Sequence, residues 1–249
     1  MISRQALADY LQDFLACGEY RDYTVNGVQV EGKPEIRRMV SAVSASQAAI
    51  AYAVEMQADA LLVHHGYFWK GEDAAVVGMK KRRLAALLKH DVNLFAYHLP
   101  LDQHPALGNN ALFAKLLPLA RVWQSKAESL LWHGELAESM RLDGVRESLS
   151  AKLDFPCCHV GDGEKTVQRI AWCTGAAQDF LQLAAQEGAQ VFCSGEYAER
   201  TYHEARENGC AYMVCGHHAT ERAGIRALGE HLAEKFSLSV NYFDEKNPF

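Results

Sequence analysis

Two adjacent histidines, His64 and His65, end one of the apolar runs of the sequence. The run 60–63 reads ALLV, which is typical of a buried β-strand, and such a strand usually stops in a polar turn. Imidazole nitrogens are common ligands of transition metals. The pair is therefore either an ordinary polar strand end or part of a chemical site at that end.

Two further apolar runs are followed by a histidine and, four residues later, by a carboxylate. The pairs are His98 with Asp102 and His217 with Glu221. Where the residues after the strand are helical, both members of a pair point the same way. Each pair alone could be an ordinary helix ion pair. Together with the adjacent histidines, they form a ligand set typical of zinc, iron, manganese or nickel, and carboxylates can bridge two such ions in hydrolytic sites.

An internal repeat places these residues in equivalent settings. Residues 38–66 and 169–197 align without a gap at an offset of 131. In each copy an apolar run leads through a small-residue turn into a helix, over 46–56 and over 177–187, and then into a second apolar run. This order predicts a β-α-β unit in each half, and hence an α/β fold with two similar lobes.

A second pair of segments continues the repeat. Residues 92–102 resemble residues 211–221 at an offset of 119, so the first copy holds about 12 extra residues. The alignment sets the following residues opposite one another: His65 and Glu196, His98 and His217, Asp102 and Glu221. Because ligands of open α/β sheets bind at the carboxyl ends of the strands, we expect both sets to line a ligand site.

The repeat predicts two lobes, over residues 1–124 and 125–249, with the boundary where the repeat signal is absent. The first lobe carries the paired histidines and the HxxxD motif, and the second carries the SGE and HxxxE motifs. The C-terminal run 238–244 either stays in the second lobe or rejoins the first.

Composition excludes several classes of protein. The formal net charge of -6 argues against unspecific binding of nucleic acid or of anionic membranes. The pattern of apolar residues in 1–20 predicts an amphipathic helix rather than a signal peptide. No apolar run approaches the ~20 residues that a membrane span needs. The seven cysteines form no CxxC motif. We therefore expect a cytoplasmic protein without a disulfide framework.

Six motifs occur in order along the chain: NGVQVEG (26–32), VHHGYFWKG (63–71), HLPLDQHPALGNN (98–110), CTGAAQDF (173–180), SGE (194–196) and GHHATE (216–221). In this combination the sequence resembles the bacterial type of the Nif-three-like family of dinuclear-metal proteins, also known as GTP cyclohydrolase I type 2 homologues. The resemblance covers essentially the whole chain.

The resemblance implies interlinked α/β lobes of the Nif-three-like fold, a ring-shaped homohexamer and two divalent metal ions per subunit. Carried over by position, the metal ligands are the following residues: His64, His65, Asp102, His217 and Glu221. His98 and Glu196, which the repeat sets opposite His217 and His65, are then candidate catalytic groups. Many members read HHP where this chain has HHG at 64–66, and HTxxD where it has HLPLD at 98–102, which leaves the substrate open.

Two classes of function follow from the resemblance. The first is a metal-dependent hydrolase that acts on a nucleotide or a related heterocycle, because the family name implies ring opening of GTP. The second is a non-catalytic ring that stores, delivers or presents metal ions. Turnover of a nucleotide by metal-loaded protein would discriminate between them.

Overall fold

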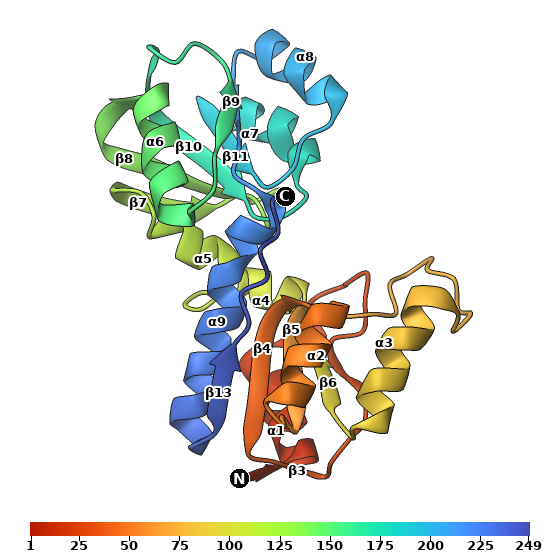
Figure 1. Cartoon of the computed structure of the whole chain (residues 1–249). Helices are drawn as coiled ribbons and strands as arrows, with labels where there is room; N and C mark the ends of the chain where they lie inside the picture. The colour runs from red at the N-terminus through yellow and green to blue at the C-terminus, as the bar shows by residue number, and fades with distance from the viewer. The chain divides into compact units, whose positions relative to one another are not determined.

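The computed structural model describes residues 1–249, which form two compact units (Figure 1). The first unit contains Met1–Leu107 and Gly224–Lys246, and the second contains Gly108–Ala223 and Asn247–Phe249. The sequence placed the boundary at residue 124 instead. Residues 108–124 lie in the second unit because Ala111, Phe113 and Leu117 pack in its core.

The first unit is built on a mixed five-stranded sheet in the order β13-β4-β5-β6-β2. Its strands are β2 (Gly27–Val30), β4 (Arg38–Ser44), β5 (Ala60–His65), β6 (Asn93–Ala96) and β13 (Ser239–Tyr242). The pairs β13–β4, β4–β5 and β5–β6 are parallel, and β2 is antiparallel to β6. The C-terminal strand thus lies in the first sheet, which is one of the two arrangements that the sequence allowed. A separate antiparallel pair joins β1 (Ile2–Ser3) to β3 (Glu35–Ile36).

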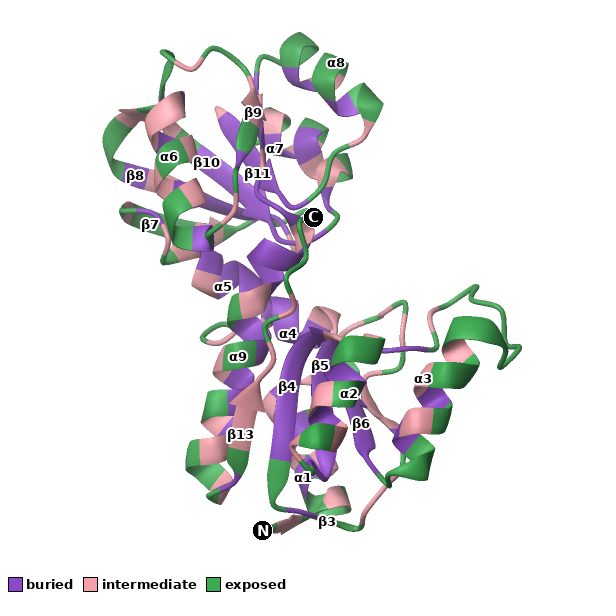
Figure 2. Ribbon diagram, in the orientation of Figure 1, coloured by how far each residue is buried: buried purple, intermediate pink, exposed green.

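Helices cover both faces of the first sheet. They are α1 (Arg4–Phe14), α2 (Gln47–Glu55), α3 (Gly78–Lys89), the short α4 (Leu99–Gln103) and a 3-10 turn, η1 (Cys17–Glu19). Buried Leu7 and Leu11 of α1 pack on one face, as the predicted amphipathic helix requires. Ile50 of α2 and Leu87 of α3 pack on the other face. Figure 2 shows β4, β5 and β6 mostly buried, whereas the outer sides of α2 and α3 are exposed.

The second unit contains a mixed six-stranded sheet in the order β7-β8-β10-β11-β12-β9. Its strands are β7 (Leu119–Gln124), β8 (Trp132–Arg141), β9 (Cys158–Val160), β10 (Thr166–Cys173), β11 (Val191–Ser194) and β12 (Ala211–Val214). The three neighbours β10, β11 and β12 are parallel. Strand β8 pairs antiparallel to β10, β9 pairs antiparallel to β12, and β7 pairs antiparallel to β8.

Helices also cover both faces of the second sheet. They are α5 (Asn109–Ala114), α6 (Leu142–Leu153), η2 (Gln178–Phe180), α7 (Leu181–Gln186) and α8 (Glu199–Glu207). Phe113 of α5 and Leu149 of α6 pack on one face, whereas Leu181 of α7 and Ala205 of α8 pack on the other. The last helix, α9 (His217–Phe236), begins in the second unit, and its residues from Gly224 onward belong to the first.

Each unit contains the predicted β-α-β element with its strands parallel. In the first unit β4, α2 and β5 form it, and in the second β10, η2 with α7, and β11 form it. Helix α2 covers 47–55 and η2 with α7 covers 178–186, which confirms the helices predicted from the repeat. No helix of the structure combines the length and the apolar character that crossing a membrane requires.

Candidate metal centre

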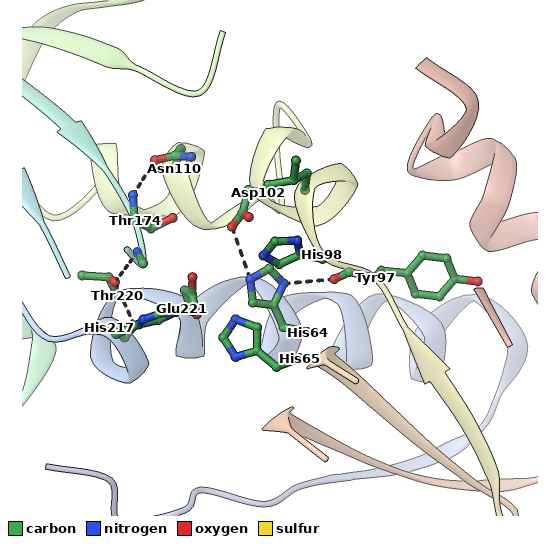
Figure 3. Close-up of polar contacts among 12 residues, drawn as sticks. His64, His65, Tyr97, His98, Asp102, Asn110, Thr174, His217, Thr220 and Glu221 are labelled. Carbon is green, nitrogen blue, oxygen red and sulfur yellow. Dashed lines mark hydrogen bonds and ion pairs between the residues drawn. The ribbon is translucent and has the colours of Figure 1, made fainter. Parts of the chain in front are cut away.

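His64 lies at the carboxyl end of β5, the central strand of the first sheet. Its side chain is fully buried, and its Nδ1 lies 3.0 Å from the carbonyl oxygen of Tyr97. A carbonyl oxygen only accepts hydrogen bonds, so Nδ1 carries the proton and Nε2 is the ligand atom. Figure 3 shows this contact from Tyr97, which follows β6.

His65 is held from the neighbouring strand. Ser44 ends β4 and pairs in register with His65, and its Oγ lies 3.2 Å from His65 Nδ1. The contact engages Nδ1, so Nε2 is again the atom that can bind a ligand. Ser44, at the end of the neighbouring strand β4, therefore helps to orient the imidazole of His65.

His98 follows β6 and precedes α4, where Asp22 and Asn26 hold it. The backbone N–H of His98 donates to Asn26 Oδ1 at 2.7 Å, and Nδ1 lies 2.8 Å from Asp22 Oδ1. The second oxygen of Asp22 accepts the backbone N–H of Leu99 at 2.9 Å. The indole ring of Trp69 packs edge-on against the His98 ring, with the ring centroids 5.0 Å apart. These contacts fix the ring of His98.

Asp22 is a buried carboxylate that stays ionised. Burial alone would raise its pKa, but the hydrogen bond and the charge of His98, with the N–H donors of Asn26 and Leu99, lower the pKa to about 2. An ionised Asp22 keeps the proton of His98 on Nδ1. Within this unit the ligand nitrogens of His64, His65 and His98 lie within 4.8 Å of one another.

Asp102 brings a carboxylate to these histidines. It lies on α4, is only 6% exposed, and its Oδ1 is 3.6 Å from His64 Nε2. Helix α4 starts directly after His98, so the HxxxD spacing places Asp102 one helical turn from His98. Asp102 thereby lies at the same strand ends as the histidines. The first unit therefore gathers three imidazoles and one carboxylate at one edge of its sheet.

The second unit gathers a histidine and two glutamates. His217 opens α9, and its Nε2 lies 3.1 Å from Glu221 Oε2 one turn later on the same helix. Its Nδ1 lies 2.6 Å from Oε1 of Glu196, which follows β11. Burial alone would lower the pKa of His217, but the hydrogen bonds and charges of Glu221 and Glu196 outweigh it and raise the pKa to about 9. A metal ion at Nε2 would have to displace that proton.

Gly175 leaves the room that the His217–Glu221 pair occupies. It follows β10 in the left-handed region, with φ +70°, and a Cβ there would lie 2.2 Å from Glu221 Oε1 and 3.3 Å from His217 Nε2. Its N–H donates to Thr220 Oγ1 at 3.1 Å, and that hydroxyl donates to the His217 carbonyl at 2.9 Å. Only glycine fits this position without disturbing the pair.

The donor sets of both units fit a divalent transition metal. Each of the four histidines has Nδ1 engaged by a protein oxygen, which is the arrangement that orients metal-binding imidazoles in proteins. Two nearly buried carboxylates, Asp102 and Glu221, accompany them. Imidazole and carboxylate donors suit zinc, iron, manganese and nickel.

The structure brings together the predicted site residues within each unit. The first unit holds His64, His65, His98 and Asp102, and the second holds Glu196, His217 and Glu221. Sequence reasoning missed Asp22, Ser44 and Gly175. Asp22 precedes β2 and Ser44 is the last residue of β4, and neither stands at a metal-ligand spacing from a histidine. Gly175 was visible only as part of the motif CTGAAQDF.

Comparison with known proteins identifies the family. The model of the Duf34/NIF3 family (NGG1p interacting factor 3) matches residues 2–248. The chain belongs to this family. The family resemblance seen in the sequence motifs is thereby confirmed.

Two curated relatives illustrate the similarity of the chain to other members of the family. A protein of Yersinia pestis named "GTP cyclohydrolase 1 type 2 homolog" is 50% identical over 243 residues, which cover 97% of this chain and 98% of the relative. A protein of the same name from Neisseria meningitidis serogroup A is 46% identical, and the match covers both chains completely.

Solved structures of family members share the fold. The protein ybgI, described as of unknown function, has 43% identity and a TM-score of 0.95, with both chains fully covered. A protein from Thermus thermophilus has 30% identity and a TM-score of 0.88, again with full coverage. The mixed α/β architecture with two mixed sheets is therefore the Nif-three-like fold.

The glycine in the HHG sequence has a local reason. A Cβ at Gly66 would lie 2.2 Å from Gln29 Oε1 and 2.6 Å from the Cβ of Ala96. Gln29 uses this space to clamp the next residue, accepting the N–H of Tyr67 at 2.6 Å and donating to its carbonyl at 2.9 Å. Glycine at position 66, in place of proline, thus leaves room for the Gln29 side chain that holds the backbone of Tyr67.

Proposed function

We propose that this chain binds two divalent transition-metal ions and is a metal-dependent hydrolase of a nucleotide or a related heterocycle. The observation that carries the proposal is that four strand-end histidines each have Nδ1 engaged by a protein oxygen. The names of the relatives, which refer to GTP cyclohydrolase, support the choice of substrate class. Zinc, iron, manganese and nickel all accept these donors, so the donor chemistry leaves the choice among the four metals open.

The proposed metal ligands are five residues: His64, His65, Asp102, His217 and Glu221. When bound, a pair of divalent ions supplies Lewis acidity and lowers the pKa of water from 15.7 toward about 7. Glu221 would hold a bound ion through its carboxylate, which offers two oxygens where an imidazole offers a single free nitrogen. Gly175 keeps the space around this carboxylate open.

Two further residues have proposed catalytic roles. His98 is oriented by ionised Asp22, and we assign it the transfer of a proton to the leaving group of the substrate. Glu196 holds Nδ1 of His217 and so directs Nε2, and its exposed part faces solvent, where a substrate can reach it. Positioned acid–base groups of this kind contribute about 10²–10⁴ in rate.

The first test is metal content and turnover of the same preparation. Protein purified without a His-tag and loaded with zinc, manganese or iron(II) is expected to hold two ions per chain by elemental analysis. Glu221→Gln keeps the shape but removes the charge, so it should lose at least one ion, whereas exposed Glu230→Gln on the same helix should lose none. Less than one ion in the wild type would reject the metal centre. Two ions without turnover of any nucleotide in a panel would reject the hydrolase.

We further propose that the two units arose by duplication and that six copies form a ring. The equivalent order of β4, α2, β5 and of β10, α7, β11, each with parallel strands, supports the duplication. The ring is supported by the family resemblance of the sequence.

A further inference from the structure

A pocket of about 420 Å³ opens in the second unit at the carboxyl ends of β11 and β12. This volume lies in the range of small-molecule sites. Glu196 and Gly216 form the part of the pocket that adjoins His217, since Glu196 bonds to His217 and Gly216 precedes it. The pocket is therefore next to one of the proposed metal ligands.

Three aromatic rings line this pocket. Phe155 follows α6, Tyr197 lies in the loop after β11, and Phe249 lies in the C-terminal segment. Tyr197 is 67% exposed and Phe249 is 78% exposed, so two large apolar side chains face water beside a cavity. Exposed apolar surface that gathers at a concave site is typical of ligand binding.

Phe155 is held close to the backbone of the site. Gly216 has φ +81°, and a Cβ there would lie 2.7–2.9 Å from the atoms of the Phe155 ring. The ring therefore lies against the peptide that leads into His217, and glycine is required for that approach. A flat ligand stacked on this wall would lie beside His217.

Glu196 is the one charged side chain among the residues that line the pocket. Its Oε1 bonds to His217, whereas Oε2 makes no hydrogen bond and the side chain is 48% exposed. The hydroxyl of Tyr212 donates to the carbonyl oxygen of Glu196 and anchors its backbone. A carboxylate can only accept, so a ligand that pairs with Oε2 must donate an N–H or O–H.

We propose that this pocket binds a planar nitrogen heterocycle, stacked on Phe155, Tyr197 and Phe249, with a ring-edge N–H donated to Glu196 Oε2. The pocket has no lysine or arginine among its lining residues, so it takes the uncharged ring of a substrate rather than a phosphate. The proposal rests on the proposed function, because it places the heterocycle of the substrate beside His217.

The test uses nucleosides, which carry the ring without phosphates. Guanosine has N–H donors on its ring edge, and purine riboside has a similar ring without them. Isothermal titration of the full chain after chelator treatment is expected to show guanosine binding at least tenfold tighter than purine riboside. Equal affinity for the two, or no binding of guanosine at millimolar concentration, would overturn the proposal.

Matched variants locate the binding in the pocket. Tyr197→Ala removes a stacking surface and is expected to weaken guanosine binding about 5- to 100-fold, while Tyr197→Phe keeps it. Tyr202→Ala removes a half-exposed tyrosine of α8 outside this pocket and should leave the affinity unchanged. Unchanged affinity in Tyr197→Ala, or an equal loss in Tyr202→Ala, would contradict the pocket.

The failure of this proposal differs from the failure of the hydrolase. If the wild type holds two ions and turns over nucleotides but Tyr197→Ala binds guanosine normally, the pocket proposal alone is wrong. If guanosine binding depends on Tyr197 but metal-loaded protein shows no turnover, the pocket proposal stands and the hydrolase is wrong.

Discussion

At the scale of single residues, the chain holds each imidazole of the candidate centre through Nδ1 by a different kind of oxygen. The partner of Nδ1 is a backbone carbonyl for His64, a hydroxyl for His65, and a carboxylate for His98 and His217. The kind of partner decides how basic the ring becomes, because an ionised carboxylate favours a protonated imidazole more than a carbonyl does. His217, whose pKa the two glutamates raise to about 9, is thus suited to carry a proton until a metal ion displaces it.

The roles of His98 and His64 can be separated by substitution. We expect His98→Ala to keep two metal ions per chain while hydrolysis falls about 10²- to 10⁴-fold, because a proton donor is lost and the ligands remain. His64→Ala should lose at least one ion. Elemental analysis and turnover rates measure both effects, with exposed His203→Ala as the control. A loss of metal in His98→Ala would show that His98 is itself a ligand.

At the scale of elements, the repeat predicted the two β-α-β elements and the strand ends on which the site residues lie. Apolar runs and small-residue turns are local signals, so the α2 and α7 regions could be located from them. The Asp22–His98 pair could not, because its members are 76 residues apart and only the folded sheet brings them together. The same holds for Gly175, whose role depends on the position of Glu221.

Helix α9 contributes core residues far from its first two turns, which carry His217 and Glu221. Ile225, Leu228 and Leu232 are fully buried against the first sheet. We expect Leu228→Ala to lower the free energy of unfolding by about 2–5 kcal/mol, as for other buried leucines. Urea denaturation followed by circular dichroism measures it. Exposed Glu230→Ala on the same helix should change it by less than about 0.5 kcal/mol, and an equal effect of both variants would contradict the packing assigned to α9.

Asp59, just before β5, binds the backbone at the beginning of the neighbouring strand β4. Its Oδ2 accepts the backbone N–H groups of Arg37 and Arg38 at 2.9 and 3.0 Å, and its Oδ1 pairs with Lys33 at 2.8 Å. Burial alone would raise the pKa of Asp59, but the bonds from Lys33 and the two N–H groups lower it. Its stabilising effect is therefore present above the unfolded pKa of about 3.9 and is lost as the pH falls through the folded pKa.

The pH dependence of unfolding tests this contribution of Asp59. Between pH 7 and 5 we expect Asp59→Asn to lower the free energy of unfolding by about 1–3 kcal/mol, because a hydrogen-bonded charge is lost. Below about pH 4 the difference from the wild type should shrink. Exposed Asp9→Asn is the control and should follow the wild type throughout. A difference that stays constant into strong acid would mean that the carboxylate charge does not matter.

At the scale of the whole molecule, the first unit is built from both ends of the chain. Residues 224–246 supply most of α9 and the edge strand β13, which pairs with β4. The boundary expected at residue 124 therefore assigned residues 224–246 to the second lobe, although they share one core with residues 1–107. Repeat periodicity reports local β-α-β order. The return of a terminal segment depends instead on which sheet edge it can pair with, and without β13 the strand β4 would be such an edge.

The last prediction concerns the assembly of copies. Tyr23, Val25 and Val77 of the first unit are 63%, 53% and 65% exposed, which provides apolar surface for association to cover. Closed symmetric rings are a common way for identical chains to bury such surface. We expect light scattering to give a mass of about six times 27.7 kDa, unchanged on dilution through the micromolar range. Chelator-treated protein is the control that separates assembly from metal binding. A monomer in both preparations would exclude the ring, and a hexamer only with metal would mean that the ions hold the copies together.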